Sequence, residues 1–197
     1  MSDTKEYIVD KCYDLFLAHS YEAVSISDIS KAIGMTKGAL YHHFASKEDL
    51  FRSVVEKHLV LPVASCDLAT ISFSDFLESN IQEMRKLIDT YMNYSPQFTP
   101  LNYISFIIDA SRHYKGFLDD KEKYVKEETA KTELVLKNSI ERGEIRDDIS
   151  VSVTAYMFTT VFMGFAGNLV MSTQDTDEAF NMLKQQIWEY YRLLKKE

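Results

Sequence analysis

The stretch that decides the fold is residues 25–51, which read SISDISKAIGMTKGALYHHFASKEDLF. Ser25 stands three residues before Asp28, and Ser46 three before Asp49, which is the spacing of a capping box at a helix start. Between these starts, Gly34 can take the left-handed conformation that ends a helix without a Cβ clash. Two short helices joined by such a turn form a helix-turn-helix, whose second helix has the size that enters a DNA major groove.

Charge is distributed unevenly around this stretch. The whole chain has a formal net charge of −8, which excludes a globally basic nucleic-acid binder. Residues 29–47, in contrast, contain Lys31, Lys37, Lys47 and two histidines but no acidic residue. A locally positive window suits a DNA reader that must not bind every phosphate, although a run of this length without an acid also arises by chance.

A longer motif runs through the same residues. It reads Ser25-x-x-Asp28-Ile29-x-x-x-x-Gly34-x-Thr36-Lys37-Gly38-x-Leu40-Tyr41-x-His43-Phe44-x-x-Lys47-x-x-Leu50. This motif resembles the DNA-binding segment of the TetR/AcrR family of transcriptional regulators. The family often has Thr in place of Ser25, a departure that keeps the hydroxyl. Because only the N-terminal part carries the resemblance, it says much about the DNA end of the chain and little about the rest.

The resemblance and the helix starts together indicate which residues meet DNA. At the recognition helix they are Thr36, Lys37, Gly38, Ala39, Tyr41 and His42. A helix N-terminus favours phosphate, and Gly38 allows close backbone approach. Ser25 and Lys47 stand at the starts of the preceding and following helices, where we expect a further phosphate contact, through the ammonium in the case of Lys47. Leu40 and Phe44 are predicted core residues, and His43 is equally compatible with packing and with DNA contact.

The predicted fold class is all-α, with three helices at the DNA end and six beyond them. Few Gly and Pro residues argue for short connections, and no strand is expected. Besides the helix-turn-helix, apolar periodicity predicts helices over residues 4–19, 46–62 or a little beyond, 72–92, 101–114, 117–142, 149–174 and 176–196. We expect a DNA-binding domain at residues 1–46 and a ligand-binding and dimerisation domain at residues 47–197.

The two cysteines and the N-terminus bear on the compartment. Cys12 and Cys66 are each placed on a predicted helix, where a buried thiol is expected more than a disulfide. Residues 1–7 are polar and acidic and contain no basic-then-apolar leader. The expectation is a cytoplasmic protein.

The uncharged segment at residues 149–174 has the length of a membrane span. Several Ser and Thr residues dilute its apolar content, and both flanks are acidic, which opposes insertion. A soluble helix that is apolar nearly all round is buried on several sides. We therefore expect a core and subunit-interface helix.

The larger part of the chain carries the residues predicted to serve a ligand and a dimer. Its aromatic surplus suits a pocket for an apolar or aromatic effector and suits an ordinary core equally well. The candidate pocket residues are Tyr91, Tyr103, Phe106, His113, Phe158 and Phe162. The candidate dimer residues are Gly164, Gly167, Ile187 and Tyr191, chosen for a flat glycine patch on one helix and for the apolar stripe and large aromatic residues of the next.

These observations favour one functional class. The prediction is a sequence-specific, ligand-responsive transcriptional regulator, most simply a repressor that binds a palindromic operator as a homodimer. The alternative is a helical small-molecule-binding protein whose helix-turn-helix no longer reads DNA. An enzyme is not expected, because the chain shows no triad order, phosphate loop or zinc pattern. Neither a cofactor nor a metal is predicted.

Overall fold

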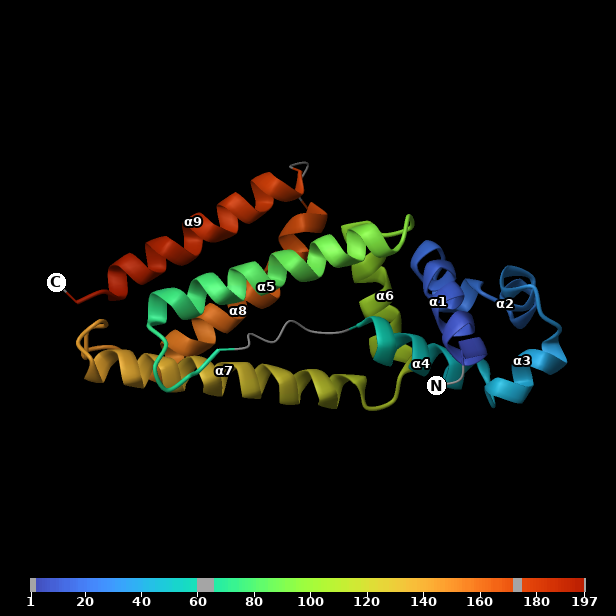
Figure 1. Cartoon of the computed structure of the whole chain (residues 1–197), viewed down its shortest axis with the longest axis horizontal. Helices are drawn as coiled ribbons and strands as arrows, with labels where there is room; N and C mark the ends of the chain where they lie inside the picture. Colours follow the sequence, from blue (N-terminus) through green and yellow to red (C-terminus); the bar gives the residue numbers. More distant parts are fainter. Residues whose placement is uncertain (1–2, 60–65, 172–174, 197) are drawn as a thin grey trace. The chain divides into compact units, whose positions relative to one another are not determined.

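The computed structural model describes residues 3–59, 66–171 and 175–196, and nine α-helices account for most of them (Figure 1). The elements are α1 (Asp3–Ala18), the 3-10 turn η1 (Tyr21–Ala23), α2 (Ile26–Ile33), α3 (Lys37–His43), α4 (Lys47–His58), α5 (Phe73–Tyr94), α6 (Pro100–His113), α7 (Phe117–Glu141), α8 (Val151–Met171) and α9 (Thr176–Leu194). The predicted all-α class and the order of helices are confirmed. The predicted extension of α4 beyond Leu59 falls outside the described residues.

The chain forms two compact units that do not follow the order of the sequence. The first unit contains Met1–Leu61 and Thr90–Leu118, and the second contains Pro62–Asp89 and Asp119–Glu197. The helices α5 and α7 therefore contribute to both. The predicted division between residues 46 and 47 concerns function and stays a prediction.

The first unit is built around α1, which packs against α2, α4 and α6. Its stripe of Ile8, Cys12 and Phe16 is buried, as the periodicity predicts for a core-facing helix. The ring of Phe51 on α4 lies 4.9 Å from that of Phe16 and 5.6 Å from that of Phe106 on α6, measured between centroids. Aromatic packing thus joins α6 to the helices of the DNA end within one unit.

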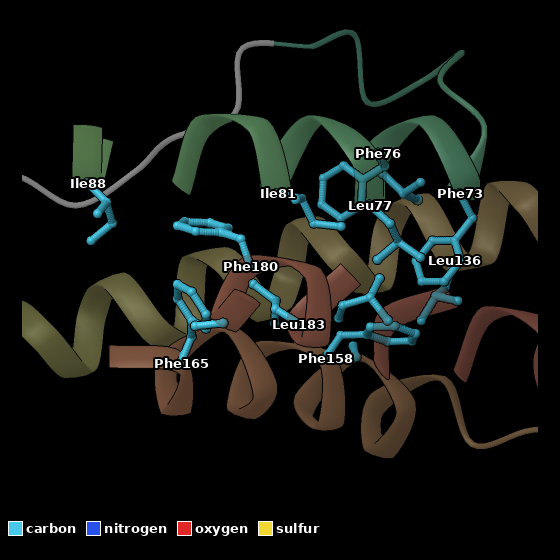
Figure 2. Close-up of a cluster of buried hydrophobic side chains, with 14 of the residues drawn as sticks. Phe73, Phe76, Leu77, Ile81, Ile88, Leu136, Phe158, Phe165, Phe180 and Leu183 are labelled. Atoms are coloured by element: carbon cyan, nitrogen blue, oxygen red, sulfur yellow. The ribbon is translucent and has the colours of Figure 1, made fainter. Parts of the chain in front are cut away.

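The second unit has an apolar core between α5, α7, α8 and α9. Figure 2 shows side chains from these helices meeting in its interior, and the buried members include Phe73, Phe76, Leu77, Ile81, Leu136, Phe158, Phe165, Phe180 and Leu183. The uncharged helix α8 buries Ala155 and Phe158 in this core. Nowhere in the described parts of the chain, α8 included, does a helix combine the length and apolarity needed to cross a bilayer.

A loop after α7 fastens the second unit together. The Glu144 carboxylate accepts hydrogen bonds from the backbone N–H groups of Phe73 at 2.9 Å and Ser74 at 3.0 Å, so it caps α5 from a distant part of the sequence. It also accepts from the Tyr191 hydroxyl at 3.2 Å. Glu144 therefore connects the start of α5, the end of α7 and the last turns of α9.

The two thiols are both free. Cys12 lies on α1 as predicted, and burial raises the pKa of its thiol to about 12. Cys66 is partly buried and lies in the bend before α5, so its predicted place on a helix is wrong.

Candidate nucleic-acid interface

The helix-turn-helix consists of α2 and α3, here called the reading pair. Their caps and the turn between them lie where the sequence predicts them. At α2, Ser25 Oγ accepts from Asp28 N–H at 3.2 Å and Asp28 Oδ2 accepts from Ser25 N–H at 2.9 Å, which completes the capping box. Gly34 ends this helix with a φ of 68°, in the left-handed region. Thr36 then caps α3, because its Oγ1 accepts from Ala39 N–H at 3.2 Å.

The second predicted capping box, at the start of α4, forms only in part. Ser46 Oγ accepts from Asp49 N–H at 3.1 Å, as predicted. The Asp49 carboxylate, however, accepts from Ala45 N–H at 3.0 Å rather than from Ser46 N–H. The hydrogen bond from the Asp49 N–H group to the Ser46 hydroxyl is thus as predicted, whereas the Asp49 carboxylate binds the N–H group one residue before the expected one.

The helix α3 is anchored by one narrow face. Leu40 and Phe44 are buried, and so are Ile29 and Ile33 on α2. His43 lies between exposed and buried. Two apolar anchors four residues apart hold α3 in place and leave the rest of its circumference open.

The open circumference carries the predicted contact residues. Every member of this recognition surface is exposed: Thr36, Lys37, Gly38, Ala39, Tyr41 and His42. Among the described residues, a Cβ built on Gly38 would meet only the Thr36 Oγ1, at 3.9 Å, so their packing does not require a glycine there. Among the described residues no carboxylate pairs with Lys37. The structure therefore brings six of the eight predicted residues together on one accessible surface.

The other two predicted residues are engaged within the chain. The hydroxyl of Ser25 serves its own capping box. The Lys47 ammonium donates to the Tyr21 carbonyl at 2.6 Å and lies 3.9 Å from the centroid of the Tyr21 ring. No sequence pattern predicts this pairing, because Tyr21 stands outside the motif.

The six candidate pocket residues fall in two different units. In the first unit Tyr91, Tyr103 and Phe106 are buried, and Phe106 packs against Tyr13 and Phe51. His113 stacks on Tyr21, with ring centroids 4.1 Å apart. In the second unit, Phe158 is buried and Phe162 is partly buried. Their role as pocket residues stays a prediction.

A groove that was not predicted lies on the first unit. It has a volume of about 550 Å³ and is open to solvent. Its lining comes from the end of α1, the segment after it and α2, namely Leu15, His19, Ala23, Val24, Asp28, Lys31 and Ala32. None of the candidate pocket residues lines it.

The four candidate dimer residues differ in accessibility. Gly164 is exposed on α8, and a Cβ built on it or on Gly167 would meet nothing within 4 Å in the part of the chain that the structure describes. Ile187, in contrast, is fully buried in the core of the second unit, and Tyr191 packs partly against that core. Gly164 is therefore accessible and Gly167 partly so, whereas the Ile187 side chain is buried inside the subunit.

Residues 8–54 match the sequence model of bacterial regulatory proteins of the tetR family. The chain is 22% identical over 188 residues to the HTH-type transcriptional repressor AcnR of Corynebacterium glutamicum, which covers 93% of this chain and 92% of AcnR.

Solved structures share the fold. A TetR transcription regulator from Haloarcula marismortui superposes with a TM-score of 0.67 at 17% identity, over 100% of both chains. SmeT in complex with triclosan superposes with a TM-score of 0.60 at 20% identity, over 91% of this chain and 89% of SmeT. Together, the matched segment, the full-length relative and the shared fold make the chain similar to regulators of the TetR/AcrR family and indicate a DNA-binding regulator.

Proposed function

We propose that this regulator is a repressor that binds a palindromic operator as a homodimer and releases it when a small molecule binds. The observation that carries the proposal is the recognition surface on α3, where six polar, small or aromatic residues are exposed around a capped helix N-terminus. A helix start of this kind offers free N–H groups to phosphate, and its side chains are available to base edges.

An exposed apolar face on α8 and α9 supports the homodimer. On α8 and α9 the second unit carries large apolar side chains that are exposed, namely Val153, Tyr156, Met157, Met163, Met182, Tyr190 and Leu193. The helix α8 contains no charged residue, so this face is poorly suited to permanent contact with water. Gly164 and Gly167 lie on the same helix and leave room for a partner backbone. A symmetric pair of such faces would close a dimer.

Dimerisation provides the means of control. Two recognition helices must be spaced by about one turn of DNA, roughly 34–36 Å, to read both halves of a palindrome. A ligand that changes this spacing releases the operator, and a coupling of about 1–3 kcal/mol is sufficient. The aromatic content of the chain and the likeness to SmeT, solved with triclosan, support an apolar or aromatic effector.

The alternative is a helical binding protein that no longer reads DNA. Such a protein has no physical need for an exposed Lys37, a glycine at residue 38 or an exposed Tyr41. The free space at Gly38 favours DNA reading over the alternative, because packing among the described residues does not require a glycine there.

The test is binding to DNA from the upstream region of the protein's own operon, measured over a range of salt concentrations. We expect tight, sequence-specific binding by the native chain and its loss in the Lys37→Ala, Tyr41→Ala double variant. Lys123→Ala, which removes an exposed charge on α7, is the matched control and should bind as the native chain does. Weak binding that ignores sequence and survives the double substitution would favour the alternative.

The homodimer has its own test. Gly164→Arg places a large cation on the exposed face of α8, where a Cβ at residue 164 has open space among the described residues. We expect sedimentation to report monomers that have lost operator affinity but retain their helical content. A dimer that survives this change would put the interface elsewhere.

A further inference from the structure

The 3-10 turn η1 is the segment that leads from α1 into the reading pair. Its first residue, Tyr21, is 4% exposed, and Val24 just after the turn is 2% exposed. The N-cap of α2, Ser25, follows directly. The position of the turn therefore sets where α2 begins, and α2 in turn positions α3 through the short Gly34 connection.

Lys47 holds this turn from α4. Its ammonium donates to the Tyr21 carbonyl at 2.6 Å and lies 3.9 Å from the Tyr21 ring centroid, which is the geometry of a cation–π contact. Hydrogen bonds from a charged donor are among the stronger ones in proteins. An ammonium directed inward in this way would have to leave both partners before it could reach a phosphate.

Two residues of α6 hold the same turn. Asp109 is 7% exposed, and its Oδ2 accepts from Tyr21 N–H at 2.6 Å. The His113 ring stacks on the Tyr21 ring, with centroids 4.1 Å apart and planes 23° apart. Both backbone polar groups of Tyr21 and its ring are thus held by residues far along the chain, all within the first unit.

We propose that Lys47 and Asp109 are positioning residues for DNA reading: they clamp the Tyr21 turn from α4 and α6, and neither contacts DNA. This inference rests on the proposed function. It changes the expected role of Lys47 from a phosphate contact to a residue that holds the Tyr21 turn through contacts inside the chain. It also connects α6 to the reading pair through one hydrogen bond to a buried backbone N–H group.

A phosphate contact and a positioning residue differ in measurable ways. Each phosphate contact contributes about 0.9 to the slope of log affinity against log salt, for specific and non-specific DNA alike. A positioning residue leaves this slope unchanged and lowers affinity only for the sequence that requires correct placement of α3. A residue that matters for stability alone changes the melting temperature but not the operator affinity of the folded protein.

The experiment uses the full chain and two DNA duplexes, one selected from a random library by the native protein and one scrambled from it. The variants are Lys47→Met and Lys37→Met, which make the same substitution inside the clamp and on the recognition surface. Lys47→Arg keeps a cation that can reach the Tyr21 carbonyl, and Asp109→Leu removes the acceptor of the Tyr21 N–H group while keeping a side chain of similar size. Circular dichroism establishes that each variant is folded.

We expect Lys47→Met to lower the affinity for the selected duplex about tenfold, as the loss of a charged hydrogen bond would. The affinity of this variant for the scrambled duplex and the slope of its log affinity against log salt should equal those of the native chain. Asp109→Leu, which has no acceptor for the Tyr21 N–H group, should behave alike, and Lys47→Arg should recover most of the affinity. Lys37→Met should flatten the slope on both duplexes.

Three outcomes would overturn the inference. A salt slope that falls in Lys47→Met as it does in Lys37→Met would make Lys47 a phosphate contact. Native operator affinity in a folded Lys47→Met with a lowered melting temperature would make the clamp structural only. Failure of the native protein to select any sequence would overturn the proposed function and the inference with it, and the first two outcomes leave the proposed function intact.

Discussion

The helices α3 and α6 both carry aromatic and polar residues of the kinds that bind other molecules, but they differ in what they expose. On α3 the Tyr41 ring is 51% exposed, whereas on α6 the Phe106 ring is fully buried. The helix α3 has only two apolar anchors, Leu40 and Phe44, so most of its residues must face outward. An abundance of aromatic residues is therefore weak evidence for a binding site, whereas a motif with fixed positions and caps is strong evidence.

The largest effect expected from this comparison is on stability. Phe106→Ala removes a fully buried ring that contacts Tyr13 and Phe51, so we expect it to lower the free energy of unfolding by about 3–5 kcal/mol. Tyr41→Ala should change it by less than about 0.5 kcal/mol, because that side chain lies on the surface and is about half exposed. Urea unfolding followed by circular dichroism measures both. Equal losses would mean that α3 is also core.

The pH dependence of stability tests the interior of the first unit. Burial lowers the pKa of His58 to about 4, against an opposing effect of Asp10, whose Oδ1 lies 3.1 Å from Nε2. Between about pH 6.5 and pH 4 the unfolded chain takes up a proton at His58 that the folded chain resists. The contribution of His58 is therefore present above that window and is lost as the pH falls through it.

We expect this loss to amount to about 3 kcal/mol for the native chain. His58→Gln cannot titrate in the window, so its unfolding free energy should vary less steeply with pH. Other carboxylates titrate in both proteins, and the difference between the two curves isolates His58. Parallel curves would show that His58 is protonated as easily in the folded state as in the unfolded one.

In the second unit, Glu144→Ala tests the contrast between a carboxylate that caps a helix and one that is exposed to solvent. This change leaves the N–H groups of Phe73 and Ser74 without their carboxylate cap, and we expect a loss of about 1–2 kcal/mol, as for other helix caps. Glu141→Ala, which removes an exposed carboxylate three residues earlier, is the control and should have little effect. A loss common to both would reflect net charge rather than capping.

The sequence was a good guide where the determinants are local. The Ser25–Asp28 box, the left-handed Gly34 and the Thr36 cap depend on neighbouring residues, so the reading pair and its exposed residues could be predicted from the motif. The helix order followed from apolar periodicity for the same reason.

The remaining features depend on contacts between distant residues. Tyr21 meets Asp109 across 88 positions, and Glu144 caps a helix 71 positions earlier. No periodicity records such pairs. Ile187 shows the same limit, because an apolar stripe does not reveal whether its members pack inside the subunit or between subunits. Here the stripe packs inside.

The smallest predicted effect compares two buried or partly buried tyrosines by the same substitution. Tyr13 is fully buried, and its hydroxyl has no hydrogen-bond partner among the described residues, whereas the Tyr191 hydroxyl donates to Glu144 at 3.2 Å. An unsatisfied buried hydroxyl costs free energy, so Tyr13→Phe should leave the melting temperature unchanged or raise it slightly. Tyr191→Phe should lower stability by about 0.5–1.5 kcal/mol. If Tyr13→Phe proves the more destabilising of the two, the Tyr13 hydroxyl has a hydrogen-bond partner in solution. The space between α1 and α6 is then the first place to look for a bound polar molecule that serves as this partner.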